Sequence, residues 1–404
     1  MSETGENTAV VIVGGGVAGL TLGNFLLRNG IGCVVLEKRS RAYVERRQRA
    51  GTIDSRGVRM FRAWGLEEVV ESFGAPEETI SFRMDGEGFT HDLFDNEDGD
   101  FDDMVFCPQQ VLVRNLTDAF LRDGGDLRYE SADISLEDIG GADIDRADIG
   151  GARPRVRYRD TTGATRVIHC DYLAGCDGYH GVSRESIPAD ALTRYSHDYG
   201  YAWLSVLADV TPDPAAMAIH SRGLAGIIPR GTTASRLYLQ CAPDDTLEQW
   251  PDERVWSELE ARFGVPVATG PVLHKQILPL RSVVYSPMSY GRLYLLGDAA
   301  HIVPPMSAKG INLALHDAEV FARAIIDRIQ KDDPALLTGY SETCLRHVWN
   351  YQAYAAWITE LMHNAGDASY EGEFRKQIAR AELERQFTSP TAKRLFGELA
   401  AGVN

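Results

Sequence analysis

Three glycines near the start of the chain stand at a spacing that suits the binding of a phosphate-bearing ligand. Gly14 and Gly16 follow the apolar run 9–13, and Gly19 lies near the start of the segment 17–28. Leucine and phenylalanine recur at helical spacing in that segment. Gly14 permits a tight turn, Gly16 lets the backbone approach a pyrophosphate, and Gly19 lets helix and strand pack closely. The free N–H groups at the start of the helix would bind the phosphates.

An acidic residue completes this pattern. A second apolar run, 33–36, ends in Glu37, where a carboxylate accepts hydrogen bonds from ribose hydroxyls. A GxGxxG sequence alone is common, but strand, turn, helix, strand and acid in this order are typical of a dinucleotide-binding βαβ unit. A glycine-rich turn in an ordinary α/β domain would leave Glu37 unexplained. The unit by itself leaves open whether the ligand is FAD or NAD(P).

A second candidate binding site is the basic stretch that follows Glu37. Lysine and arginine crowd residues 38–62 although the chain has a formal net charge of −17: Lys38, Arg39, Arg41, Arg46, Arg47, Arg49, Arg56, Arg59 and Arg62. Bidentate arginine suits a phosphorylated anion better than lysine does. A solvated helix face is the structural alternative.

Composition limits the possible classes of function. A chain of 404 residues accommodates two domains, or one large domain with an insertion. The acidic balance argues against nucleic acid and anionic membranes as partners. Without an eighteen-residue apolar run or a signal-like start, we expect a cytoplasmic protein. The six cysteines form no CxxC pair, so we expect reduced thiols, and we expect no metal because no ligand cluster has the required spacing.

Hydrophobic periodicity predicts the elements that must position these residues. Helices are expected over 109–122, 252–263, 310–330 and much of 335–387. Strands are expected over 79–84, 89–93, 156–159, 166–170, 199–210, 224–228, 236–242 and 293–298. The sequence Asp-Ile-Gly-Gly-Ala occurs at 138–142 and again at 148–152. Such a repeat is typical of an extended surface hairpin, and we assign no chemistry to it.

Three separated motifs resemble those of one family, the single-component flavin-dependent aromatic hydroxylases. They are the glycine turn with Glu37, the turn Cys176-Asp177-Gly178, and Gly297-Asp298-Ala299-Ala300-His301 followed by Pro304-Pro305. Within the family the chain is most similar to the 4-hydroxybenzoate 3-monooxygenases, through residues 47–51, 171–184, 279–282 and 297–312.

This resemblance implies a fold of the α/β class. It implies a Rossmann-like FAD-binding domain (1–75, 100–185 and 275–335), an inserted antiparallel-sheet substrate domain (76–99 and 186–274) and a C-terminal helical region (336–404). A homodimer is also implied.

The resemblance also implies the cofactors, their residues and the reaction. FAD would be held by Gly14, Gly16, Gly19, Glu37, Arg49, Gln109, Asp298 and Gly310. NADPH would be held by Arg47, His180 and Arg281, with Arg49 also at its pyrophosphate and the stretch 38–43 at its 2′-phosphate. Pro305 and Asn312 would lie at the catalytic centre. NADPH would reduce FAD, O2 would form a flavin C4a-hydroperoxide, and an electron-rich ring would be hydroxylated.

The substrate-binding residues match the family at one end only. Arg230 takes the place of the arginine that pairs with a benzoate carboxylate, and Tyr238 that of its tyrosine partner; for Arg230 a structural salt bridge is the alternative. At the other end, two tyrosines and a histidine that draw a proton from the substrate phenol are replaced by Met217, Ala400 and Glu77. Ile228 replaces a serine near the carboxylate.

The substrate is therefore expected to differ from 4-hydroxybenzoate. Met217 and Ala400 cannot carry a proton, and losing two phenol rings enlarges the pocket. We expect an aromatic acid that is activated by an amino group or an indole-like ring, or one that is bulkier. The alternatives are a plain 4-hydroxybenzoate 3-monooxygenase, a non-oxygenating flavin reductase, and a flavin-binding sensor.

Overall fold

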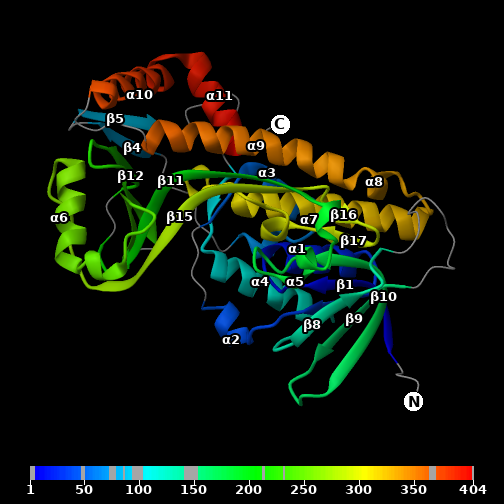
Figure 1. Cartoon of the computed structure of the whole chain (residues 1–404). Coiled ribbons are helices and arrows are strands. Elements are labelled where there is room, and N and C mark those ends of the chain that lie inside the picture. The colour runs from blue at the N-terminus through cyan, green and yellow to red at the C-terminus, as the bar shows by residue number, and fades with distance from the viewer. Residues whose placement is uncertain are drawn as a thin grey trace.

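The protein has a mixed α/β architecture, which confirms the expected fold class. The computed structural model describes residues 5–46, 51–71, 79–84, 87–92, 103–140, 153–211, 214–230, 233–363 and 370–402. Two sheets lie end to end beneath one long helix, and two long strands run from one sheet toward the other (Figure 1).

The first sheet contains the expected βαβ unit. Its strands run in the order β16 (Ser289–Tyr290), β17 (Leu293–Leu295), β10 (Thr165–Gly175), β1 (Glu6–Val13), β2 (Cys33–Leu36) and β7 (Asp126–Arg128). The hairpin of β8 (Ala132–Glu137) and β9 (Arg155–Arg159) extends it from β10. From β17 to β7 the strands are parallel. Their carboxyl ends therefore meet at one edge, where ligands bind in such sheets.

Helices cover this sheet and position its loops. The helix α1 (Val17–Arg28) lies against both α4 (Gln109–Arg122) and α7 (Gly310–Lys331). The chain also contains several short elements. They are α2 (Arg41–Val44), α3 (Ser55–Ala63), α5 (Val182–Glu185), the 3-10 turns at Glu67–Val69, Ala189–Ala191, Leu247–Gln249, Gly297–Ala299 and Pro305–Ser307, and the paired strands β3 (Thr52–Ile53) and β6 (Val105–Phe106).

The second sheet is almost entirely antiparallel. Its order is β18 (His301–Ile302), β15 (Val272–Ser286), β11 (Thr193–Ala208), β14 (Ala234–Cys241), β13 (Ala225–Arg230), β12 (Ala216–Ile219), β4 (Thr79–Met84) and β5 (Glu87–Asp92). Only β12 and β4 pair in parallel. The long strands β11 and β15 link this sheet to the first (Figure 1). The domain boundary expected at residue 275 thus falls inside β15.

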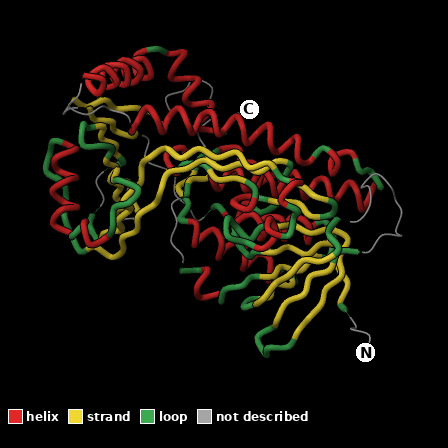
Figure 2. Tube along the Cα trace, in the orientation of Figure 1, coloured by secondary structure: helices red, strands yellow, loops and turns green. Residues whose placement is uncertain are grey.

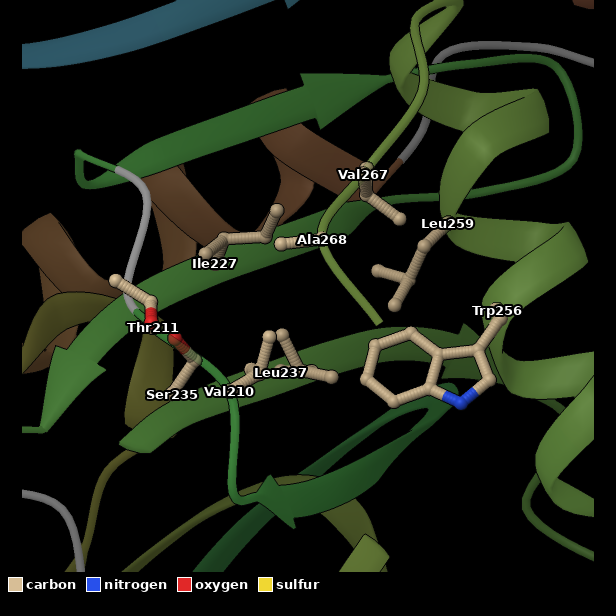
Figure 3. Close-up of a pocket in the computed structure, with 9 residues that line it drawn as sticks. All are labelled: Val210, Thr211, Ile227, Ser235, Leu237, Trp256, Leu259, Val267 and Ala268. Carbon is tan, nitrogen blue, oxygen red and sulfur yellow. The ribbon is translucent and has the colours of Figure 1, made fainter. Parts of the chain in front are cut away.

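The two faces of the second sheet have different partners. Helix α6 (Asp252–Phe263) packs on one face, where Leu204, Leu237 and other apolar side chains form a cluster of their own. Figure 3 shows this side, with Trp256 and Leu259 of α6 beside Ile227 and Leu237 of the sheet. The opposite face packs into the main core of the molecule.

The C-terminal helices extend over both sheets. They are α8 (Ala335–Thr338), α9 (Tyr340–His363), α10 (Tyr370–Thr388) and α11 (Pro390–Ala401). Helix α9 crosses above both sheets, while α10 and α11 lie near the β4–β5 end of the second sheet (Figure 2). No helix in the described ranges combines the length and apolar character that a membrane span requires.

The predicted elements agree with the structure except in detail. The helices expected over 109–122 and 252–263 occur with these bounds. The strand expected over 293–298 was predicted too long: β17 ends at Leu295, because Gly297 adopts a φ of 60° and starts a 3-10 turn. The surface hairpin is formed by β8 and β9, but residues 141–152, which include the second repeat copy, lie outside the described part.

Candidate active site

The glycine turn between β1 and α1 leaves an open space at the helix N-terminus. Gly14 has a φ of 112°, and a side chain there would collide with the backbone of Cys176. A Cβ on Gly19 would collide with the carbonyl of Gly14, so the bare glycine lets the helix lie close to the strand. Beside Gly16 no atom lies within 4 Å of a Cβ position, and Gly16 caps α1 without a side-chain hydrogen bond. The first turn of α1 is thus without a side-chain cap beside an open space, as an anion site requires.

Glu37 is fixed beside this turn at the end of β2. Its side chain is buried, and Oε2 accepts a hydrogen bond from Gly15 N at 2.9 Å. Its other oxygen, Oε1, accepts from Arg39 N at 2.7 Å. Each carboxylate oxygen keeps acceptor capacity for a further donor. The acid is thus oriented before any ligand binds.

A buried acid that the sequence analysis missed holds the loop carrying Asp298. Asp317 of α7 is fully buried, and its Oδ2 accepts from Gly297 N at 2.8 Å. The same oxygen lies 2.7 Å from His301 Nε2. Burial alone would lower the pKa of His301, but the charge and hydrogen bond of Asp317 outweigh it and raise the pKa. Asp298, partly exposed in the 3-10 turn that follows β17, is positioned by these contacts.

The start of α7 is a second open helix N-terminus. Gly310 is exposed, and its N-cap residue Lys309 makes no side-chain capping bond. Pro305 lies in the exposed 3-10 turn just before it, with its carbonyl accepting from Ala308 N at 3.0 Å. A carbonyl has a second lone pair, so this oxygen can still face a ligand. Such a helix start favours negative charge nearby.

Asn312 joins α7 to the β3–α3 loop. Its Oδ1 accepts from Asp54 N at 3.1 Å, and its Nδ2 donates to Thr52 O at 3.0 Å. Lys309, also buried, donates to Asp54 Oδ2 at 3.0 Å and to the carbonyl of Ala400 at 2.6 Å. Burial lowers the pKa of Lys309 and Asp54 opposes that shift. Ala400 therefore contributes its backbone, through Lys309, to this part of the site.

The four expected substrate-binding residues lie on one face of the second sheet. In register, Met217 pairs with Gly226 and Gly226 with Tyr238, while Ile228 and Arg230 follow Gly226 at two-residue steps. Neighbours in register and residues two apart share a face. This is the face opposite α6, so strand pairing alone brings Arg230, Tyr238, Met217 and Ile228 together.

The end of this face that carries Arg230 and Arg236 is rich in positive charge. Burial raises the pKa of Tyr238, and the Arg230 guanidinium opposes this through its charge and a hydrogen bond. Buried Arg230 Nε has no hydrogen-bond partner among the described residues. Arg236, also on this face, is buried, and burial together with the nearby charge of Arg230 lowers its pKa. An anion placed between the two guanidinium groups would relieve their repulsion.

Tyr238 is itself held by an aromatic and a histidine. Its ring lies 4.5 Å from that of Trp203, whose Nε1 donates to His363 Nε2 at 2.6 Å. His363 Nδ1 lies 2.7 Å from the carbonyl of Thr359. Burial lowers the pKa of His363 to about 4, so the ring is neutral at pH 7, with the proton on Nδ1. The sequence analysis missed this support.

The residues expected at NADPH meet around Tyr179. Arg281 lies over the Tyr179 ring at 4.2 Å, and the His180 ring is 4.9 Å away. The pKa of Tyr179 is lowered, because Arg281 and Arg194 outweigh the opposing effect of burial. The structure thus brings His180 and Arg281 together at a basic, partly exposed surface. Arg47, Arg49 and Glu77 lie outside the described residues.

Part of the basic stretch 38–62 is neutralised by carboxylates. Arg41 contacts Glu45 and Asp118 at 2.6 Å each. Arg62 contacts Asp103 at 2.5 Å, and Arg56 lies 3.4 Å from Glu319. These arginines serve ion pairs at the surface, so the stretch is not one continuous anion site.

Comparisons with known proteins identify the family. Residues 7–355 match the family described as FAD binding domain. The chain is 36% identical to the p-hydroxybenzoate hydroxylase of Acinetobacter baylyi over 402 residues, which cover 98% of this chain and 95% of that one. The chain is an FAD-dependent aromatic monooxygenase.

Solved structures show the same fold. The p-nitrophenol 4-monooxygenase of Pseudomonas putida superposes with a TM-score of 0.81 at 19% identity, covering 99% of this chain and 100% of the other. An aklavinone-11 hydroxylase, solved with FAD and aklavinone, superposes with a TM-score of 0.74 at 20% identity. The match covers 91% of this chain and 70% of that chain.

The residues present fit the FAD of this family. The open turn at Gly16 and the oriented Glu37 suit its pyrophosphate and ribose, and the start of α7 at Gly310 suits its electron-accepting ring. Gln109 begins α4, and the neighbouring Gln110 has a buried Oε1 without a partner in the described structure. The sequence analysis named Gln109 but missed Gln110.

Arg236 is the missed residue that the sequence could have revealed. It stands two residues before Tyr238 in a predicted strand, and alternation places both on the same face. No local sequence pattern points to Asp317, Lys309 or His363, because each forms its hydrogen bond with a residue distant in sequence.

Proposed function

We propose that this monooxygenase uses NADPH to hydroxylate an aromatic carboxylic acid other than 4-hydroxybenzoate. The observation that carries the proposal is the asymmetry of one sheet face. Arg230 interacts with Tyr238 at one end, where the two are proposed to bind an anion, whereas Met217, at the proposed phenol end, offers no group that exchanges protons. Activation of the ring then rests on the substrate itself, through an amino group or an electron-rich heterocycle.

The protein's own residues bind and orient the substrate. The substrate carboxylate is bound by Arg230 and Tyr238, and Arg236 adds positive charge. Trp203 fixes the Tyr238 ring. Pro305 directs a carbonyl at the ring substituent, and Asn312 fixes the neighbouring loop. Bound FAD supplies the activation of O2, and the buried surroundings keep water from the reacting atoms.

NADPH is proposed to bind at the basic surface around Tyr179. Arg281 and His180 meet there, and guanidinium groups suit a pyrophosphate. We further propose a homodimer in the cytoplasm. All six cysteines are free thiols, which fits a reducing compartment.

The test is a panel of aromatic acids offered to the purified FAD protein. NADPH and O2 consumption, peroxide and hydroxylated product are measured for 4-hydroxybenzoate, 4-aminobenzoate, 3-amino-4-hydroxybenzoate and larger indole acids. We expect coupled product from an acid other than 4-hydroxybenzoate. Coupled hydroxylation of 4-hydroxybenzoate would establish the plain hydroxylase instead. NADPH oxidation without product from any acid would favour a reductase, and no response at all a sensor.

A further inference from the structure

Gly226 is a glycine inside a strand whose backbone conformation does not require one. It lies within β13 and has no positive φ, unlike Gly223 just before this strand, whose φ is 106°. Glycine weakens the interior of a strand and commonly marks a place where another group comes close. The reason for this glycine therefore lies in its surroundings.

The side chain of Met217 occupies the space that Gly226 leaves. The two residues pair in register on neighbouring strands. A Cβ built on Gly226 would lie 2.7 Å from Met217 Sδ and 3.4 Å from its Cε. Any larger residue at position 226 would thus displace the thioether, which is able to move because methionine is unbranched and flexible.

Gly226 is also connected to Arg230, through Tyr238. Tyr238 pairs with Gly226 on its other side, and its Cδ2 lies 3.5 Å from the same Cβ position. Arg230 donates a hydrogen bond to the hydroxyl at the far end of this tyrosine. One tyrosine ring therefore spans the distance from the guanidinium to Gly226. A benzoate bound at Arg230 and lying along this ring places the substituent opposite its carboxylate beside Met217.

The chemistry of Met217 limits which substituent suits this position. Met217 and Tyr238 are both buried. A thioether is only a weak hydrogen-bond acceptor and takes no proton from a phenol. An apolar group packs against it without leaving a polar atom unpaired, and the flexible side chain adapts to the size of that group.

We propose that Gly226 and Met217 determine the specificity of the substrate site, and that they select a bulky electron-donating group without an exchangeable proton, such as a dialkylamino group, opposite the carboxylate. The proposal rests on the proposed function, since Arg230 and Tyr238 must bind the carboxylate. Such a donor activates the ring by itself, so no residue has to remove a proton from it. Gly226 keeps the thioether against the sheet, where it packs on the alkyl groups.

The test compares three acids that differ only in the group opposite the carboxylate. Dissociation constants of the FAD-loaded protein are measured by isothermal titration calorimetry for benzoate, 4-aminobenzoate and 4-(dimethylamino)benzoate. We expect the added methyl groups to tighten binding about tenfold relative to 4-aminobenzoate. Gly226→Ala is expected to reduce this preference to about twofold or less, because the displaced thioether takes the place of the methyl groups.

A double-mutant cycle assigns this effect to the Met217 side chain. In a Met217→Ala background, Gly226→Ala should change the ratio of the two dissociation constants by less than about twofold. The matched control is Gly88→Ala, an exposed glycine in β5 with no atom within 4 Å of its Cβ position, and it keeps the preference. Met217→Phe leaves Gly226 in place but puts a stiff ring over it, so this variant should also lose the preference. Circular dichroism checks that each variant is folded.

Three results would overturn the inference. They are 4-(dimethylamino)benzoate binding no more tightly than 4-aminobenzoate, a preference that persists in folded Gly226→Ala or Met217→Phe, and an equal effect of Gly226→Ala in the Met217→Ala background. Benzoate binding that is lost in Arg230→Ala would then leave the proposed function intact. If none of the three acids binds, both proposals fail.

Discussion

The two faces of the second sheet are built from the same strands but carry different kinds of side chain. Toward α6, Leu204, Ile227 and Leu237 belong to an apolar cluster; Figure 3 shows Ile227 and Leu237 on this side. On the other face, neighbouring residues of the same strands include Arg236 and Tyr238, both buried. Buried polar groups cost stability unless they are paired. The strands therefore bury arginine and tyrosine on one face and mainly aliphatic side chains on the other.

A small pocket without charged lining residues occurs on each side of the second sheet. The α6-side pocket is lined by apolar residues with Thr211 and Ser235, and no lining side chain carries a charge (Figure 3). The pocket near Phe82 is lined by apolar residues and Gln386, and neither Arg230 nor Arg236 belongs to its lining.

The largest expected effect is on the packing face. Leu237→Ala removes a buried side chain from the α6 cluster and should lower the free energy of unfolding by about 3 kcal/mol. The dissociation constant for an aromatic acid should stay within about twofold. Denaturant unfolding and ligand titration of the same preparation measure both quantities. A large loss of affinity with little loss of stability would abolish the distinction between the faces.

Arg230→Ala is expected to show the reverse pattern. Losing a charge-assisted contact should weaken binding of the acid by about a hundredfold, equivalent to roughly 3 kcal/mol. Stability should be kept or slightly raised, because Arg236 loses a repulsive neighbour. Calorimetric titration measures the dissociation constant, and thermal unfolding measures the melting temperature. A fall in melting temperature with unchanged affinity would make Arg230 a structural residue.

The face that carries Tyr238 should also be sensitive to acid through His363. Its folded pKa of about 4 lies below the unfolded value of about 6.5, so between these pH values only the unfolded state gains the proton. Stability is therefore unaffected above pH 7 and is lost as the pH falls from 6.5 toward 4.

At pH 5 the loss from His363 is about 2 kcal/mol. His363→Gln keeps an acceptor for Trp203 and removes the titration, so its unfolding free energy should fall less between pH 7 and pH 5. Chemical denaturation at both pH values measures this. His316 and His347, with pKa values of about 2 and 3, remain in both proteins, so the difference isolates His363. Equal pH dependence would show that His363 is not buried and neutral.

Local patterns in the sequence were enough for most of the fold. The glycine turn, the helix 109–122 and the alternation of 236–242 each depend on neighbours in the chain, and periodicity records these. The placement of Arg230, Tyr238 and Met217 on one face needed only family similarity and strand register.

The supporting contacts of the site could not be predicted in this way. Lys309 reaches Asp54, and Trp203 reaches His363, across 255 and 160 residues of chain. Neither pair has a periodic or motif signature, because tertiary packing alone brings the partners together. The same holds for the small apolar pocket lined by Phe82, Trp357 and Leu383, whose wall combines β4, α9, α10 and α11.

The smallest expected effect comes from removing a single hydroxyl group from each face of the sheet. Ser235 faces the α6-side pocket, and its buried Oγ has no partner in the described structure. Ser235→Ala removes an unsatisfied polar atom, so stability should rise by up to about 1 kcal/mol, with ligand affinity unchanged. Tyr238→Phe removes one hydroxyl from the opposite face and should weaken acid binding about fivefold. If Ser235→Ala weakened binding as much, the α6 face would also contribute to the site.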